Sequence, residues 1–318
     1  MGIGALGGCL WGLDTVILGI AMALPPFIGP EAAAVAGIVG AALHDVFCAV
    51  WMFAYMGARG RWHDTLRALR TRSGKVVAVG ALLGGPIGMT GYALAIANIG
   101  AGYTAIISAF YPALGTLLAT LLLKEKMSAK QVVALFIALI AVCYMGFSAS
   151  GATDVPGNAA LGVVSALACL VGWGSEAVLC AWGMRDDSVD NQTALHIRET
   201  ASALAYLVFV IPLFGAYGLT LAALPTPADA GIALAAAAGT ASYLCYYRAI
   251  AGIGAARGMA INISYAAWAV VFGVVLQHAM PSGADIVCCV AIMVGTVLAA
   301  SDWNELFRRT QNGRGSAR

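Results

Sequence analysis

The sequence predicts an all-α polytopic membrane protein, with ten transmembrane helices arranged as two inverted five-helix repeats. Of its 318 residues, 61% are hydrophobic and only 10% are charged, whereas an average soluble domain has about 25% charged residues. A soluble chain of this length could not cover its surface with so few charges. Two further observations support the prediction. A Trp-Gly-x-acid pattern occurs once in each half, at Trp11–Asp14 and at Trp173–Glu176, and the basic residues alternate between connections.

The spans are predicted from apolar length and from the turn residues between them. A helix of about 20 apolar residues crosses a hydrocarbon layer roughly 30 Å thick. Pro, Gly and Asn punctuate the chain at 25–26, 98–100, 154–157, 225–227 and 281–283, and these residues favour turns. The ten predicted spans are residues 3–24, 31–57, 74–97, 102–123, 129–149, 158–183, 192–216, 228–252, 256–280 and 283–301.

Apart from Arg198 in the seventh span, the Lys and Arg residues lie in or beside the even-numbered connections and in the C-terminal tail. The odd-numbered connections have none, so the positive-inside rule places both termini and the even connections in the cytoplasm. The N-terminus lacks a basic segment typical of a cleaved signal peptide, so we expect the first span to be retained. The basic residues are Arg59, Arg61, Arg67, Arg70, Arg72 and Lys75 in the second connection, Lys124, Lys126 and Lys130 in the fourth, Arg185 in the sixth, Arg248 and Arg257 beside the eighth, and Arg308, Arg309, Arg314 and Arg318 in the tail.

The two halves resemble each other at an offset of about 155 to 160 residues. Ala97-Asn98-Ile99-Gly100-Ala101 resembles residues 251–255, and Ala105-Ile106-Ile107-Ser108 resembles residues 260–264. Because five helices per half is an odd number, the second copy must enter the membrane from the opposite side. We therefore expect a first repeat over residues 1–150, a second over residues 156–303, and a basic cytoplasmic tail over residues 304–318.

Aromatic side chains are the first candidates for a substrate site. Tyr243, Tyr246 and Tyr247 share one helical face, and so do Asn262, Tyr265 and Trp268. Trp11 and Trp173 belong to the repeated pattern. Tyr and Trp also gather at membrane interfaces, but Tyr265 and Trp268 fall near the middle of their predicted span. Buried Tyr and Trp need hydrogen-bond partners, so their convergence indicates a polar cavity.

Ionisable residues inside the spans are the second set of candidates, because such groups are costly in a membrane and mark functional sites. Glu176 and Asp14 end the repeated pattern, and His44-Asp45 lies in the middle of the second span. We expect these four to serve in coupling or in proton or cation binding, with a structural polar pair as the alternative for His44 and Asp45. His196, Arg198 and Glu199 fall in the seventh span; the first two lie near its cytoplasmic end, where snorkelling or pairing with a loop is the alternative to function.

Aromatic rings together with carboxylates describe a site for a cation. A quaternary ammonium cannot donate an N–H hydrogen bond and is held by cation–π contacts, each worth about 0.5–1 kcal/mol when exposed and about 2 kcal/mol when desolvated. An anionic substrate would instead require buried Arg or Lys, and the sequence places none at mid-membrane. The eight cysteines all lie in apolar spans without a C-x-x-C pair, so we predict no metal site, cofactor or disulfide.

Several stretches resemble a known family. The ten-helix inverted layout resembles the EamA branch of the drug/metabolite transporter superfamily. Residues 8 to 280 are similar to the bacterial LicB-type choline permeases, most closely at His44-Asp45 and in the segments 80–89, 173–176, 242–247 and 262–268. The resemblance implies choline uptake across a bacterial inner membrane, driven by protons or by the membrane potential. It also implies that the ammonium group lies near Trp11, Trp173, Tyr243, Tyr246, Tyr265 and Trp268. Asp14, Glu199 and Arg248 depart from the family pattern.

Two alternatives stay open. The superfamily includes exporters of amino acids and cationic metabolites, and the sequence does not fix the direction of transport. An intramembrane enzyme is the third hypothesis, but the chain has no H-E-x-x-H, G-x-S-x-G or phosphate-cradling motif. The expected partners are therefore a small cationic substrate, the lipid bilayer and protons, without nucleic acid. The sequence leaves open whether the protein is a monomer or a dimer.

Overall fold

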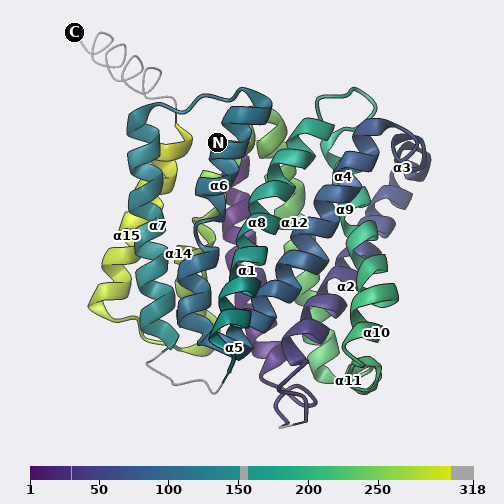
Figure 1. The fold of residues 1–318 in the computed structure, drawn as a ribbon, viewed down its shortest axis with the longest axis vertical. Helices are drawn as coiled ribbons and strands as arrows, with labels where there is room; N and C mark the ends of the chain where they lie inside the picture. The colour runs from purple at the N-terminus through teal and green to yellow at the C-terminus, as the bar shows by residue number, and fades with distance from the viewer. Residues whose placement is uncertain (30, 151–156, 302–318) are drawn as a thin grey trace.

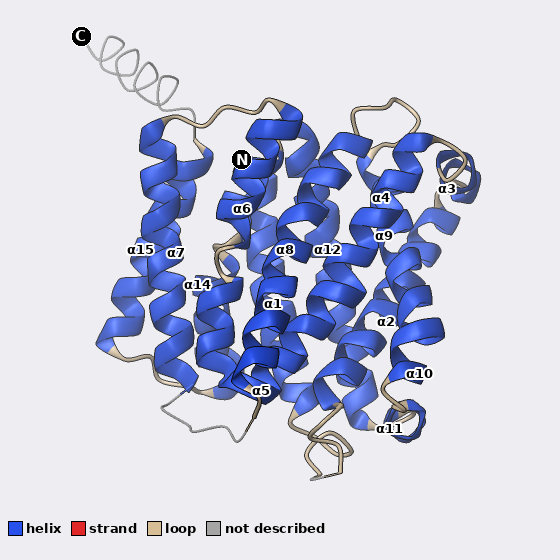
Figure 2. Ribbon diagram, in the orientation of Figure 1, coloured by secondary structure: helices blue, strands red, loops and turns tan. Residues whose placement is uncertain are grey.

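The protein is helical throughout the part that the computed structural model describes, residues 1–29, 31–150 and 157–301. The long helices run side by side, with the connections gathered at the two ends of the bundle (Figures 1 and 2). The predicted turn at residues 154–156 and the tail at residues 304–318 lie outside the described residues. Among the described residues, nine helical segments are long and apolar enough to cross a membrane, and a shorter apolar helix covers Tyr111–Leu123. The chain is a multi-pass membrane protein.

The helices of the first half are α1 (Gly2–Met22), α2 (Ala36–Ala58), α3 (Trp62–Ala68), α4 (Arg72–Leu82), the π-helical η1 (Leu83–Met89), α5 (Thr90–Ser108), α6 (Tyr111–Leu118), the π-helical η2 (Ala119–Leu123) and α7 (Ala129–Ser150). Those of the second half are α8 (Ala159–Gly183), α9 (Asn191–Ala205), the π-helical η3 (Tyr206–Val210), α10 (Ile211–Leu213), α11 (Tyr217–Ala223), α12 (Pro227–Ile253), α13 (Ala255–Asn262), α14 (Tyr265–Gln277) and α15 (Gly283–Ala300). The short helices α3 and α11 lie at opposite ends of the bundle (Figure 1), and the sequence did not predict them.

Two glycines interrupt the helices at corresponding places in the two halves. Gly100 has φ 79° and ψ 163° within α5, and Gly254 has φ 89° and ψ 163° between α12 and α13. Only glycine adopts this backbone region without strain. The first interruption separates the predicted third and fourth spans, and the second separates the predicted eighth and ninth.

A second pair of interruptions follows each glycine. The helix after Gly100 breaks at residues 109–110, between α5 and α6, and the helix after Gly254 breaks at residues 263–264, between α13 and α14. Each discontinuous helix then ends in a left-handed residue, Lys124 (φ 58°, ψ 28°) or His278 (φ 56°, ψ 26°). The two halves therefore share the same sequence of backbone irregularities, at the same spacing.

The glycine of each Trp-Gly-x-acid pattern permits close helix packing. A Cβ on Gly12 of α1 would lie 2.6 Å from Cβ of Trp268 on α14, and a Cβ on Gly174 of α8 would lie 2.9 Å from the Tyr111 carbonyl on α6. These distances are too short for real contacts, so each position requires glycine. The pattern thus packs a continuous helix of each half against a discontinuous helix of the other, and its Trp lies beside that contact.

Candidate functional site

A cavity of about 80 Å³ lies between the helices of the two halves. Its walls come from α1, α6, α8, α12, α13 and α14, together with the last residue of η1. Five of its lining residues are aromatic residues that the sequence predicted for the substrate site, and a sixth is the predicted Asn262. The lining also includes the carboxylate of Glu176. The lining residues are Trp11, Met89, Tyr111, Trp173, Glu176, Ala177, Tyr243, Tyr246, Tyr247, Asn262 and Tyr265.

The aromatic rings of the cavity contact one another edge to face. The rings of Trp11 and Tyr243 have centroids 4.8 Å apart at an interplanar angle of 89°, and those of Trp173 and Tyr111 are 5.6 Å apart at 85°. Tyr265 lies 6.4 Å from Trp11. Edge-to-face packing is the favourable geometry for aromatic pairs, and it fixes the rings, so the cavity keeps its shape without a ligand.

Both helix breaks lie beside the cavity. Tyr111 is the first residue of α6, Asn262 is the last of α13 and Tyr265 is the first of α14. Discontinuous helices with free backbone groups form the substrate sites of many transporters. Within the described residues, Oδ1 of Asn262 has no hydrogen-bond partner. The cavity therefore offers a ligand both ring faces and the Oδ1 atom of Asn262.

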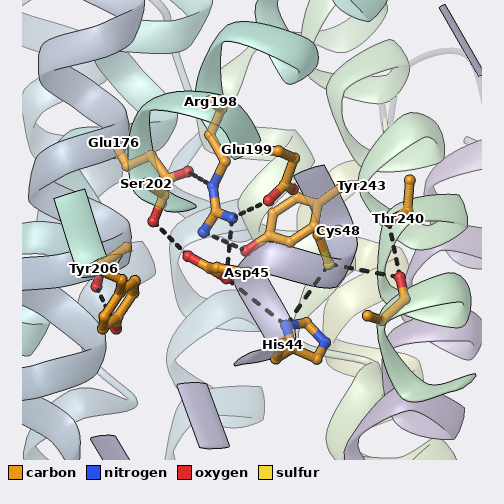
Figure 3. Close-up of polar contacts among 12 residues, drawn as sticks. His44, Asp45, Cys48, Glu176, Arg198, Glu199, Ser202, Tyr206, Thr240 and Tyr243 are labelled. Carbon is orange, nitrogen blue, oxygen red and sulfur yellow. Dashed lines mark hydrogen bonds and ion pairs between the residues drawn. The ribbon is translucent and has the colours of Figure 1, made fainter. Parts of the chain in front are cut away.

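A buried ionic network adjoins the cavity on the side of α9 (Figure 3). Arg198 is only 2% exposed, and its guanidinium donates from Nε to Glu176 Oε1 at 2.9 Å and from Nη1 to Glu199 Oε2 at 2.8 Å. Nη2 donates to the Tyr243 hydroxyl at 3.1 Å, and the guanidinium carbon lies 4.6 Å from the centre of the Tyr243 ring. One arginine thus joins α8, α9 and α12.

The network continues onto α2 and α1. Asp45 lies 3.5 Å from Arg198 Nη1 and accepts a hydrogen bond from the Ser202 hydroxyl. His44 has a carboxylate at each ring nitrogen, Asp45 at 3.7 Å from Nδ1 and Asp14 at 3.0 Å from Nε2. The four acids are all buried. The chain of contacts therefore runs from the cavity wall at Glu176 to Asp14 on the first helix.

A π-helical segment makes room for this network. Residues 83–89 form η1, in which Gly84 faces Glu176 and Gly85 faces Ser202. A Cβ on Gly84 would clash with the Glu176 carboxylate, and one on Gly85 would clash with the Ser202 hydroxyl. Single-turn π segments inside helices frequently mark functional sites. The glycine-rich segment 80–89 thus packs directly against the Glu176 carboxylate and the Ser202 hydroxyl.

The burial of Arg198 was not expected from the sequence. The sequence placed Arg198 near the cytoplasmic end of its span and no basic residue at mid-membrane, but Arg198 is buried against three carboxylates. The reason is that α9 packs against α2, α4 and α12, so this face of α9 points into the bundle. Glu199 forms an ion pair with Arg198. Arg248 is exposed and lies outside the network.

The structure gathers most of the predicted residues but separates one from the rest. The predicted residues that line the cavity are Trp11, Trp173, Glu176, Tyr243, Tyr246, Asn262 and Tyr265. Asp14, His44 and Asp45 lie behind it in the ionic network. Trp268 instead lines a peripheral pocket with Val271, Val290 and other apolar residues.

Four lining residues were not predicted as part of the site. Tyr247 lies on the face already recognised on α12, and its hydroxyl is 3.3 Å from Glu176 Oε1. Ala177 is the neighbour of Glu176 on α8. Tyr111 follows the break at residues 109–110, and Met89 is the last residue of η1. The Tyr-Pro sequence at 111–112 is a signal that could have identified Tyr111, because Pro is favoured in the first turn of a new helix.

The cavity shares lining residues with a cleft at one end of the bundle but not with the pocket at the other end. Tyr111, Trp173 and Tyr265 also line a cleft of about 530 Å³, which extends to Met280 and Asp285 at the connection between α14 and α15. A separate pocket of about 360 Å³, beside Glu125 and Arg257, shares no lining residue with the cavity. The cavity thus adjoins only the first of these two openings.

Glu125 caps a helix at the opposite end of the bundle, beside the second pocket. Glu125, which follows η2, accepts hydrogen bonds from the backbone N–H groups of Ala255 and Ala256 at 2.9 and 3.0 Å. These are the first two residues of α13, whose N-terminus carries partial positive charge. This contact ties the first half of the chain to the second.

Comparison with known proteins agrees with this architecture. Residues 3–147 match the EamA-like transporter family. Protein LicB of Haemophilus influenzae is 29% identical over 201 residues, which cover 63% of this chain and 66% of LicB. A protein of known crystal structure has a TM-score of 0.69 at 20% identity, over 93% of this chain and 95% of its own. The last comparison shows a shared fold.

Proposed function

We propose that this multi-pass membrane protein, a relative of the EamA-like transporters, is a secondary transporter that imports choline or a related quaternary-ammonium cation by alternating access. The observation that carries the proposal is the cavity walled by aromatic rings with one carboxylate, Glu176, among them. The driving force is a proton gradient or the membrane potential, which is worth about 2.3 kcal/mol per 100 mV for a monovalent cation.

Ring faces suit a quaternary ammonium better than hydrogen-bond acceptors do. Its methyl groups shield the charge and leave no N–H to donate, so each desolvated ring contributes about 2 kcal/mol by cation–π attraction. Tyr243 already holds the Arg198 guanidinium against its face, with the charged carbon 4.6 Å from the ring centre. Trp11, Trp173, Tyr246 and Tyr265 present further rings to the cavity, and we assign them to the ammonium group.

The proposed architecture is ten spans in two inverted repeats, residues 1–150 and 156–303. The paired interruptions at Gly100 and Gly254, and the paired left-handed ends at Lys124 and His278, support it. In this arrangement both termini and the basic connections face the cytoplasm of a bacterial cell. The substrate cavity then lies at the repeat interface, as in other transporters with inverted repeats.

The same arrangement assigns the two openings. The cleft beside Met280 faces outward, and the Glu125 contact with α13 closes the cytoplasmic side. The structure then corresponds to a state that receives substrate from outside. Release into the cell requires the contact between Glu125 and α13 to break.

Counterflow in proteoliposomes tests the proposed substrate. Vesicles loaded with unlabelled choline should accumulate labelled choline, and ethanolamine, which keeps N–H donors, should exchange more weakly. The Trp173→Ala variant should lose most of the exchange, whereas Trp268→Ala, outside the cavity, should keep it. Exchange of lysine in place of choline would contradict the proposal and support an exporter of amino acids.

A further inference from the structure

Negative charge exceeds positive charge in the ionic network. Four buried carboxylates, on Asp14, Asp45, Glu176 and Glu199, face one guanidinium and one imidazole. Even with His44 in its imidazolium form, two negative charges remain unbalanced within the described residues. Buried charges without partners cost several kcal/mol each. Two additional positive charges would therefore neutralise this buried region.

The three carboxylates around Arg198 differ in how many hydrogen-bond and ion-pair partners they have. Glu176 Oε1 accepts from Arg198 Nε and lies 3.3 Å from the Tyr247 hydroxyl. Asp45 accepts from Ser202 and also lies near His44 and Arg198. Glu199 has only the contact of Oε2 with Arg198, and its Oε1 has no partner in the described part of the chain, although the residue is 0% exposed.

We propose that Glu199 is the proton-binding site of the transporter and is distinct from the substrate site at Glu176. The proposal rests on the cation-transport function given above and names the residue that couples it to protons. The sequence had assigned this role to Glu176, Asp14, Asp45 or His44. Glu176 lines the substrate cavity, so its negative charge serves the substrate, while the unpartnered oxygen of Glu199 offers a proton a place away from that cavity.

Arg198 separates the two sites. Its Nε faces Glu176 and its Nη1 faces Glu199, so the guanidinium charge lies between the substrate and the proton. The substrate cation and the proton therefore repel each other little, because Arg198 and the carboxylates paired with it lie between the two sites. One proton on Glu199 and one substrate cation beside Glu176 together neutralise the network, which is the condition for closing the cavity. Both ligands then favour the same closed state, and linkage of this kind gives symport.

The groups that face Glu199 come from four helices. Arg198 adjoins it on α9, Asp45, His44 and Cys48 approach from α2, and Glu176 on α8 and Tyr243 on α12 complete the surroundings through Arg198. Of the carboxylates near Arg198, Glu199 is the one that neither lines the cavity nor contacts a hydroxyl. A neutral Gln at this position can keep the hydrogen bond to Arg198 Nη1 while losing the ability to bind a proton.

The test compares exchange with pH-driven accumulation in proteoliposomes, using labelled choline. Wild-type protein should accumulate choline when the outside is made acidic at zero membrane potential. Glu199→Gln should retain choline counterflow, which needs no net proton movement, and should lose the pH-driven accumulation. Glu199→Asp, which keeps a carboxyl group, should retain at least part of it. Glu31→Gln, a change of an exposed acid, should behave like wild type in both assays.

Three outcomes would overturn the assignment. These are full pH-driven accumulation by Glu199→Gln, wild-type protein that does not respond to the pH gradient, and loss of both activities by a folded Glu199→Gln. If the variant does not fold, infrared spectroscopy of wild-type protein decides: the carbonyl band of a protonated carboxylic acid should be present without substrate near neutral pH, and its absence contradicts the proposal. Failure of the proposed function differs from all of these, because wild-type protein would then show no choline counterflow.

Discussion

Tyr111, Trp173 and Tyr265 line both the central cavity and the adjoining cleft, so in the proposed mechanism a substrate that enters through the cleft meets these rings first. We expect Trp173→Ala, Tyr246→Ala or Tyr265→Ala each to weaken choline binding by about 1–2 kcal/mol, or roughly 5- to 30-fold in Kd. Phe at the tyrosine positions should have a smaller effect, because the ring face remains. Calorimetric titration of the purified variants measures this. Unchanged affinity in all three Ala variants would remove the rings from the site.

Arg198 is the residue on which the stability of the network depends. Arg198→Ala leaves three buried carboxylates without their common partner, and loss of one member of a buried ion pair costs about 3–5 kcal/mol. We expect thermal unfolding in detergent to shift to clearly lower temperature, or folded protein to be lost. A melting temperature equal to that of wild type would show that the guanidinium does not hold the network together.

The sequence predicted the aromatic residues better than the ionic network. Regular helical spacing placed Tyr243 and Tyr246 on one face correctly. The same reasoning grouped Trp268 with Asn262 and Tyr265, but only the latter two line the cavity, although Tyr265 and Trp268 lie on the same helix α14. The burial of Arg198 was not predicted, because it depends on which helices surround α9, and spacing along one helix does not contain that information.

At the scale of the elements, η1 supports the acidic side of the site. We expect Gly84→Ala to abolish choline transport, because a Cβ there would clash with the Glu176 carboxylate. Alanine otherwise favours a helix by about 1 kcal/mol over glycine, so the loss would come from the displaced side chain. Gly19→Ala on α1, where nothing lies within 4 Å of the new Cβ, is the matched control for counterflow measurements. Normal exchange by Gly84→Ala would separate Glu176 from the transport mechanism.

The contact between Glu125 and α13 is the second element with a testable role. Glu125→Ala removes the acceptor for the N–H groups of Ala255 and Ala256. We expect faster amide hydrogen exchange over residues 255–258, because the first turn of α13 loses its cap and, in the proposed orientation, the cytoplasmic side opens more often. Glu31→Gln should leave this segment as protected as in wild type. Equal protection in Glu125→Ala would mean that the contact does not close the cytoplasmic side.

Helix positions were largely predictable because apolar length and turn residues are local signals. The breaks inside the discontinuous helices were not, because residues 101–123 and 255–277 are apolar across their breaks. The segments that follow the breaks begin at Tyr111 and Tyr265, which line the cavity, and Pro112 lies in the first turn of the first of them.

At the scale of the whole molecule, the proposed transport cycle involves one cavity, one ionic network and two openings. In this proposal the cation lies among rings from both halves, a proton and the substrate neutralise the network behind it, and the Glu125 contact closes the side that must open for release. Each part depends on the position of the cation, because a substrate bound elsewhere would leave both the rings and Glu176 without a role.

The position of the cation is therefore the most direct test. A crystal structure with the arsenic analogue of choline, in which arsenic replaces the quaternary nitrogen, would locate the charged centre by anomalous scattering. The account predicts one peak inside the cavity, between the rings of Trp11, Trp173, Tyr246 and Tyr265 and on the side of Glu176. A peak confined to the outer cleft or to the peripheral pocket beside Trp268, or no peak at saturating concentration, would contradict it.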